Sequence, residues 1–87
     1  MIKKLITEFI GTFIFLSVIL ATGDPLAIGL ALAVAIYFGA KVSGGHFNPA
    51  VSVMLYLKNS INDKELVGYI ITQVLGGIAA LKFFQSK

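Results

Sequence analysis

Long apolar stretches, separated by a few charged residues, constrain the fold of this chain more than any other feature. A helix that spans a bilayer needs about 20 residues. The first stretch reaches that length if Glu8 is counted inside it, and the last does so if Lys82 reaches back to the interface. The sequence therefore predicts three membrane spans, at residues 4–23, 25–41 and 64–84.

The composition supports a membrane protein and excludes other classes. Hydrophobic residues make up 57% of the 87 residues and charged residues 13%, against about 45–50% and 25% in a typical soluble domain. A soluble monomer needs more surface charge, and a disordered chain has fewer apolar residues. The length fits one structural unit over residues 1–87. The chain has no Cys, and its net charge of +3 is too dispersed for a nucleic-acid patch.

A fourth uncharged stretch, residues 42–57, contains signals that break a helix. Paired glycines precede Asn48 and Pro49, and Asn before Pro is typical of a helix start. A helix over residues 49–57 would be about 13.5 Å long, roughly half a bilayer core. An extended segment over residues 43–47 would cover about 16 Å. We therefore interpret residues 43–57 as a strand-like descent and a half-helix that form a re-entrant loop; the alternative is an extramembrane loop followed by a surface helix.

Small residues at four-residue intervals indicate close helix packing. Such stripes let helices approach each other in lipid. They comprise Ala27, Ala31, Ala35 and Gly39 in the second span and Gly68, Thr72, Gly76 and Ala80 in the third. Asn62 with Glu65 resembles a capping box that opens the third span. The predicted fold class is an all-α membrane protein with three transmembrane helices and one re-entrant half-helix.

Lysines predict the orientation of the chain in the membrane. With three spans, one side carries Lys3, Lys4, Lys41, Lys58 and Lys64, and the other carries Lys82 and Lys87. Because cytoplasmic loops are enriched in positive charge, we expect a cytoplasmic N-terminus in a plasma membrane or bacterial inner membrane. A cleaved signal peptide is the alternative for the first stretch, but Glu8 and the later hydrophobic segments weigh against it.

The break in the fourth stretch has the chemistry of a path for neutral solutes. A half-helix N-terminus repels cations, and Asn48 can cap that helix through its oxygen while its NH2 group faces a cavity. The carbonyls of Gly44, Gly45 and His46 can face the same cavity as acceptors. Glu8, an ionisable residue inside a span, can accept hydrogen bonds from the N–H groups of the loop. This set suits water or a small polyol better than an ion.

Catalysis and metal binding find little support in the sequence. His46 is the only histidine, and a metal site usually needs three or four ligands. We expect no cofactor, no metal and no enzyme activity.

These motifs together resemble the N-terminal half of the aquaporin, or major intrinsic protein, family. The resemblance covers nearly the whole chain and rests on residues 8–13, on the NPA loop at residues 43–52, and on Gly68, Tyr69, Ile70, Gln73, Gly76 and Gly77. It implies a water channel in which Asn48, Pro49 and Ala50 form the NPA motif and Asn48 donates to permeating water. It also implies that the carbonyls of Gly44, Gly45 and His46 line the pore and that Glu8 braces the loop.

The resemblance also implies features outside these motifs. Ile28 takes the position of a filter residue that is often aromatic or His in the family, which makes the filter wider and more apolar. A complete pore needs a second, inverted half, either as a separate chain or as an inverted copy of this one. The solute is then water or a small neutral molecule such as glycerol. The alternatives are a truncated, non-transporting member and a small membrane protein that modulates a full-length channel.

Overall fold

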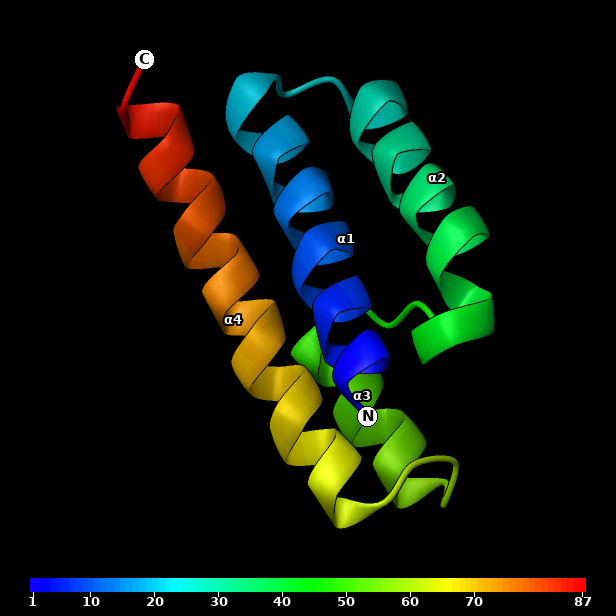
Figure 1. The fold of residues 1–87 in the computed structure, drawn as a ribbon. Coiled ribbons are helices and arrows are strands. Elements are labelled where there is room, and N and C mark those ends of the chain that lie inside the picture. The colour runs from blue at the N-terminus through cyan, green and yellow to red at the C-terminus, as the bar shows by residue number, and fades with distance from the viewer.

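The computed structural model describes residues 1–87 and contains four α-helices and no strand. The helices are α1 (Ile2–Ala21), α2 (Pro25–Ser43), α3 (Pro49–Leu57) and α4 (Asp63–Gln85). Helix α1 lies between α2 and α4, and α3 packs beside α4 (Figure 1). The N-terminus and the α3–α4 turn lie at one end of the bundle, and the C-terminus and the α1–α2 connection lie at the other (Figure 1). The predicted all-α class is confirmed.

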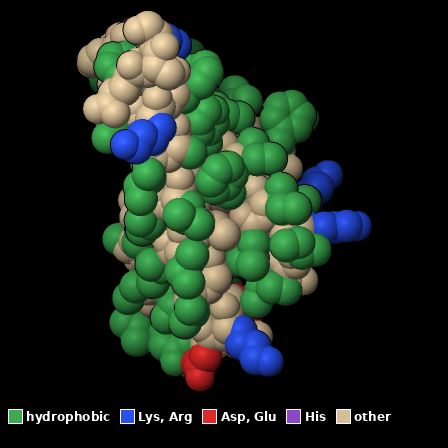
Figure 2. Space-filling model, turned by 60° about the vertical axis from the view of Figure 1, so that its left-hand side comes forward, with side chains coloured by type: hydrophobic (Ala, Val, Ile, Leu, Met, Phe, Trp, Pro, Cys, Tyr) green, Lys and Arg blue, Asp and Glu red, His purple; other side chains and the backbone are tan.

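Three of the helices, α1, α2 and α4, are long and apolar enough to cross a membrane. Their outward surfaces carry large hydrophobic side chains that no other part of the chain covers, such as Leu26, Leu30, Tyr37 and Phe38 on α2. Figure 2 shows a face covered largely by hydrophobic side chains, with lysines and acidic residues towards its margins. Because this surface would be unfavourable in water and favourable in lipid, the chain is an integral membrane protein.

Helix starts follow the capping signals in the sequence. Asp24 accepts a hydrogen bond from the backbone N–H of Leu26, with Pro25 at the first position of α2. Asn62 and Glu65 form a reciprocal capping box at the start of α4. The capping box and the start of α3 at Pro49 are as predicted.

The segment before α3 corrects one sequence prediction. Helix α2 continues to Ser43, and the following loop is not a strand-like descent. Gly44 (φ 91°), Gly45 (φ 64°) and Phe47 (φ 53°) all have left-handed backbone conformations. The loop therefore turns sharply and does not run as a strand, because left-handed residues turn the chain where extended residues would lengthen it.

Small residues bring the three long helices together as their spacing predicts. None of the eight residues in the two stripes is exposed, and Ala35, Gly39, Gly76 and Ala80 are buried. A Cβ added at Gly76 would lie 2.8 Å from the Phe9 carbonyl oxygen and 3.2 Å from the Phe13 backbone nitrogen. Helices α1 and α4 thus touch through their backbones, which only a glycine at position 76 allows.

Candidate functional site

Asn48 caps α3 and keeps its amide group free. Its Oδ1 accepts a hydrogen bond of 2.8 Å from the backbone N–H of Ala50, and Pro49 occupies the first helical position. The Asn48 side chain is exposed, and its Nδ2 donates to no group of the chain. Asn48 therefore presents a donor beside a helix N-terminus, where the unpaired N–H groups and the helix dipole favour electron-rich atoms.

Glu8 lies beneath the loop and is completely buried. Its Oε2 accepts hydrogen bonds from the Ser43 hydroxyl (2.7 Å) and the backbone N–H of His46 (3.1 Å). Its Oε1 accepts from the backbone N–H of Phe47 and from Nε2 of Gln73, each at 2.8 Å. One carboxylate thus satisfies two loop N–H groups, which would otherwise be unpaired in an apolar environment.

A second row of polar contacts extends this network to α3 and α4. Gln73 Nε2 also donates to Ser52 Oγ (2.9 Å), and Ser52 Oγ lies 2.8 Å from Nδ1 of His46. The Tyr69 hydroxyl donates to the Ser43 carbonyl oxygen at 2.6 Å. All of these side chains are buried. The loop is therefore connected to every helix of the bundle by polar contacts or through the chain itself.

Sequence reasoning did not assign roles to Ser43, Ser52, Tyr69 or Gln73 in this network. Their signal was a polar side chain within an apolar helix: Ser52 lies in a helix of otherwise apolar character and Gln73 lies midway along a span. Polar residues in membrane helices usually face the protein interior and find partners there. The pattern could have identified them as interior residues. The distances in sequence between Glu8 and its partners Ser43 and Gln73, 35 and 65 positions, hid that these polar side chains share one network.

Phe47 anchors the loop by shape. Its ring is 2% exposed and fits between α1 and α2 at Gly11 and Gly39. A Cβ at Gly11 would overlap the ring, and one at Gly39 would lie 2.7 Å from Cζ. The two glycines are therefore the socket for this aromatic side chain, and no pattern in the sequence indicates that they share it.

Two cavities lie on either side of the loop. One, of about 340 Å³, lies towards the N-terminal end of the bundle and is lined by Lys4, Gly44, His46, Glu65 and Tyr69 among others. The other, of about 310 Å³, is lined by residues near the middle of α1 and α4, together with Phe47, Asn48 and Pro49. The α3 N-terminus thus lies at mid-length of the long helices, where a re-entrant loop would place it.

The remaining predicted positions are distributed around this loop. Ala50 supplies the N–H that Asn48 caps, and Gly45 is buried against Ile36 and Ala40 of α2. Ile28 lies in the first turn of α2 and lines neither cavity beside the loop. The structure therefore brings together all the predicted site residues except Ile28.

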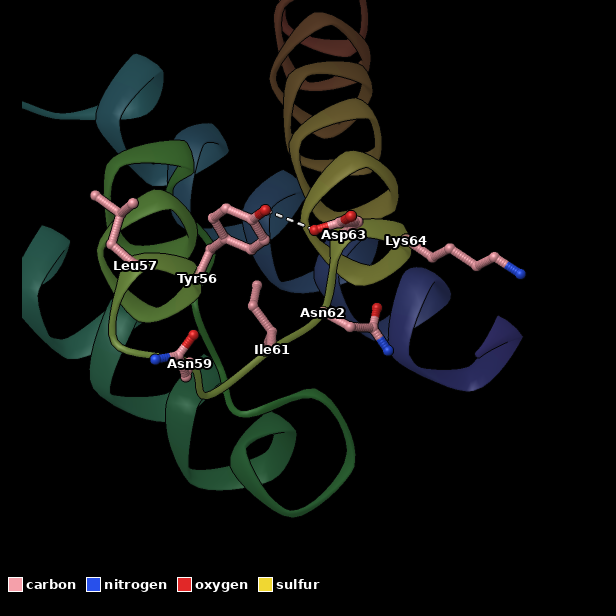
Figure 3. Close-up of a pocket in the computed structure, with 7 residues that line it drawn as sticks. All are labelled: Tyr56, Leu57, Asn59, Ile61, Asn62, Asp63 and Lys64. Carbon is pink, nitrogen blue, oxygen red and sulfur yellow. Dashed lines mark hydrogen bonds between the residues drawn. The ribbon is translucent and has the colours of Figure 1, made fainter.

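A larger hollow lies at the α3–α4 turn and is separate from this site. It has a volume of about 670 Å³, and its lining residues are labelled in Figure 3. The Tyr56 hydroxyl donates to Asp63 at 2.6 Å across it (Figure 3). This hydrogen bond raises the pKa of Tyr56, because ionisation of the phenol would place a second negative charge beside the Asp63 carboxylate. The contact ties the end of α3 to the start of α4.

The arrangement defines a class of membrane protein in which a short helix begins midway between spanning helices. The family model described as "Major intrinsic protein" matches residues 22–86. The chain therefore belongs to the major intrinsic protein family.

Curated relatives agree with this assignment. Glycerol uptake facilitator protein-like 6 of Lactiplantibacillus plantarum is 45% identical over 97% of this chain and 44% of its own length. Aquaporin Z of Photorhabdus laumondii is 39% identical over 92% of this chain and 41% of its own length. Aquaporin PIP2-7 of Arabidopsis thaliana is 35% identical over 97% of this chain and 36% of its own length. The chain thus spans about two fifths of the length of these relatives.

Proposed function

We propose that this chain forms one half of a passive channel for water or small neutral solutes such as glycerol. The free Nδ2 donor of Asn48 at the N-terminus of α3 carries the proposal. It would donate to the oxygen of a passing solute, while the positive end of the α3 dipole repels cations. The names of two relatives, an aquaporin and a glycerol uptake facilitator-like protein, support the same class of solute.

The pore would be completed by a second, inverted half that faces the exposed side of Asn48. A single half leaves the N-terminus of α3 open on that side, and backbone groups at mid-membrane depth need protein or water around them. An inverted half would also bring its own half-helix to the same level. We expect Gly44, Gly45 and His46 to contribute carbonyl acceptors to the path, Ile28 to contribute to a wide, apolar filter, and Glu8 to keep the loop in place.

Osmotic shrinkage of proteoliposomes tests this function. The chain is reconstituted alone and together with an inverted half, and water permeability is measured by stopped-flow light scattering. Asn48→Asp keeps an oxygen that can cap α3 but replaces the NH2 donor with a negative charge. We expect it to reduce permeability at least about tenfold, the equivalent of one charged-group interaction of about 1.5 kcal/mol.

Asn59→Asp is the matched control, because it makes the same chemical change at an exposed residue of the α3–α4 turn. It should leave permeability unchanged. Native permeability in Asn48→Asp would contradict the proposed path. If the native chain gives no more permeability than protein-free liposomes in both preparations, the channel proposal is wrong and a non-transporting role is favoured.

We also propose a plasma-membrane or bacterial inner-membrane location with the N-terminus in the cytoplasm. Five of the seven lysines lie at the end that carries the N-terminus and the α3–α4 turn, in line with the positive-inside rule. Reporter fusions at the C-terminus should therefore report an extracytoplasmic location. A cytoplasmic C-terminal reporter would contradict this orientation.

A further inference from the structure

Only one assignment of donors and acceptors is consistent with the hydrogen bonds around His46. Both oxygens of Glu8 accept a backbone N–H, so the carboxylate acts as an acceptor at each. The Gln73 amide must then turn its NH2 group towards Glu8, because the reverse placement would set two oxygens 2.8 Å apart. The same NH2 group donates to Ser52 Oγ. Ser52 therefore receives one hydrogen bond and still has its own proton to donate.

The Ser52 proton has one acceptor within reach. Ser52 is completely buried, and its hydroxyl makes no hydrogen bond to a backbone carbonyl. Its only other polar neighbour is Nδ1 of His46, at 2.8 Å. A proton on Nδ1 would leave the Ser52 hydroxyl hydrogen buried without an acceptor, which proteins rarely tolerate. Nδ1 therefore accepts, and a neutral imidazole then carries its proton on Nε2.

We infer that Ser52 is a positioning residue that holds His46 as the Nε2–H tautomer, with this N–H directed as a donor into the 340 Å³ cavity at the N-terminal end. Nε2 makes no hydrogen bond within the chain and is not enclosed. The Tyr69 ring packs edge-on against the imidazole at 4.8 Å between centroids. A Cβ at Gly44 would lie 3.2 Å from Nε2, so the glycine keeps the space beside this atom open.

The ligand that fits this donor is a small, neutral hydrogen-bond acceptor, and we assign it as the oxygen of water. This part rests on the proposed function, which brings water through the loop region. The cavity already contains the carboxylate of Glu65, but Lys4 engages it at 2.6 Å. The Nε2–H group of His46 is thus a second donor on the proposed water path, in addition to the Asn48 amide.

His46 is the only histidine, so ¹⁵N-histidine labelling gives a single-site measurement in lipid bilayers. One-bond ¹⁵N–¹³C correlations identify which nitrogen carries the proton. We expect Nε2–H in at least about fivefold excess over Nδ1–H, the ratio that one net hydrogen bond of about 1 kcal/mol supports. We also expect polarisation transfer from water to Nε2–H. A spectrum dominated by Nδ1–H, or an Nε2–H that receives nothing from water, would overturn the inference.

Ser52→Ala tests the positioning role, because it leaves Nδ1 without its donor. The Nε2–H excess should fall towards that of a free neutral histidine, in which Nε2–H is already the major tautomer, whereas Ser52→Cys, which keeps a weak donor, should retain part of the additional excess. Ser60→Ala is the matched control: Ser60 lines the same cavity from the exposed turn. An unchanged ratio in Ser52→Ala would exclude Ser52 as the cause. If Ser52→Ala does not fold, the native spectrum still decides the tautomer.

The spectra need no transport, so the two proposals can fail separately. Nε2–H in contact with water but no permeability would contradict the channel alone. Nδ1–H in a permeable preparation would contradict the tautomer alone.

Discussion

The loop before α3 is held by two anchors of opposite kinds, the Glu8 carboxylate and the Phe47 ring. The Glu8 carboxylate accepts hydrogen bonds from the loop backbone and from buried side chains. The Phe47 ring instead fills a socket made by Gly11 and Gly39. In a membrane, shape complementarity drives packing, and every backbone polar group needs a partner. The comparison shows that the two anchors have different roles. Phe47 fixes the position of the loop, and Glu8 supplies the hydrogen-bond acceptors that the loop backbone needs in that position.

Removal of Glu8 should have the largest effect. Glu8→Ala leaves the N–H groups of His46 and Phe47 and one Gln73 N–H without an acceptor, whereas Ser43 can still bond to the Gly39 carbonyl. At about 1–3 kcal/mol for each buried unsatisfied group, we expect a loss of about 5 kcal/mol in the free energy of unfolding. Unfolding in mixed detergent micelles, followed by circular dichroism, measures this loss.

Glu8→Gln sharpens the same prediction. Each oxygen of Glu8 accepts a backbone N–H, so a glutamine must turn its NH2 group towards one donor or the other. It should therefore lose roughly half as much stability as Glu8→Ala. A loss below about 1 kcal/mol for Glu8→Ala would mean that water replaces the carboxylate, and the polar side of the comparison would fail.

The Phe47 socket should respond to volume and not to polarity. Gly11→Ala places a methyl group within the Phe47 ring, so we expect a loss of about 2–3 kcal/mol from overpacking. A smaller side chain at position 47, in Gly11→Ala/Phe47→Leu, should recover part of that loss. The measurement is a double-mutant cycle under the same unfolding conditions.

Gly29→Ala is the control for this cycle, because nothing lies within 4 Å of a Cβ added there. It should stabilise α2 by about 0.5–1 kcal/mol through higher helix propensity. If Gly11→Ala behaves like Gly29→Ala, the Phe47 ring is not confined by its socket.

The difference between the two anchors also explains what the sequence could predict. The N-cap at Asn48, the start of α3 at Pro49 and the capping box at the start of α4 depend on residues within a few positions of each other. Such local patterns have strong intrinsic preferences. The fold class followed in the same way, from the length and spacing of apolar segments.

Contacts between segments that are distant in the sequence were harder to predict. The left-handed conformation of Phe47 has no local cause and results from the socket that α1 and α2 provide. The polar partners of Glu8 come from α2, from the loop before α3 and from α4, and their sequence separations carry no period. The strand-like descent was therefore predicted wrongly, because backbone length alone does not show where a side chain will anchor.

Alanine substitutions at the two loop glycines should separate the cost of backbone strain from the cost of overpacking. Gly44 and Gly45 both have positive φ, so Ala at either position costs about 1–2 kcal/mol. A Cβ at Gly45 would also meet the backbone of α2, at 3.4 Å from Cα of Ile36 and 3.6 Å from Cα of Ala40, which cannot move aside. A Cβ at Gly44 would meet only the His46 ring, at 3.2 Å, and a side chain can shift. Gly45→Ala should therefore be the more destabilising of the two in the same unfolding measurement. The reverse order would show that the His46 ring, 3.2 Å from a Cβ at Gly44, yields less than the backbone of α2.

The smallest effect should come from the ion pair at the end of the bundle, outside both anchors of the loop. Lys4 Nζ lies 2.6 Å from Glu65 Oε2, and the Lys4 side chain is 42% exposed. Exposed pairs contribute about 0–1 kcal/mol. Glu65→Gln isolates this term, because glutamine can preserve the capping box with Asn62 while it removes the charge. We expect a loss below about 1 kcal/mol that disappears in high salt, as screening of an exposed pair requires. A larger, salt-independent loss would show that the end of the bundle, and not only the two anchors of the loop, sets the position of α4 against α1.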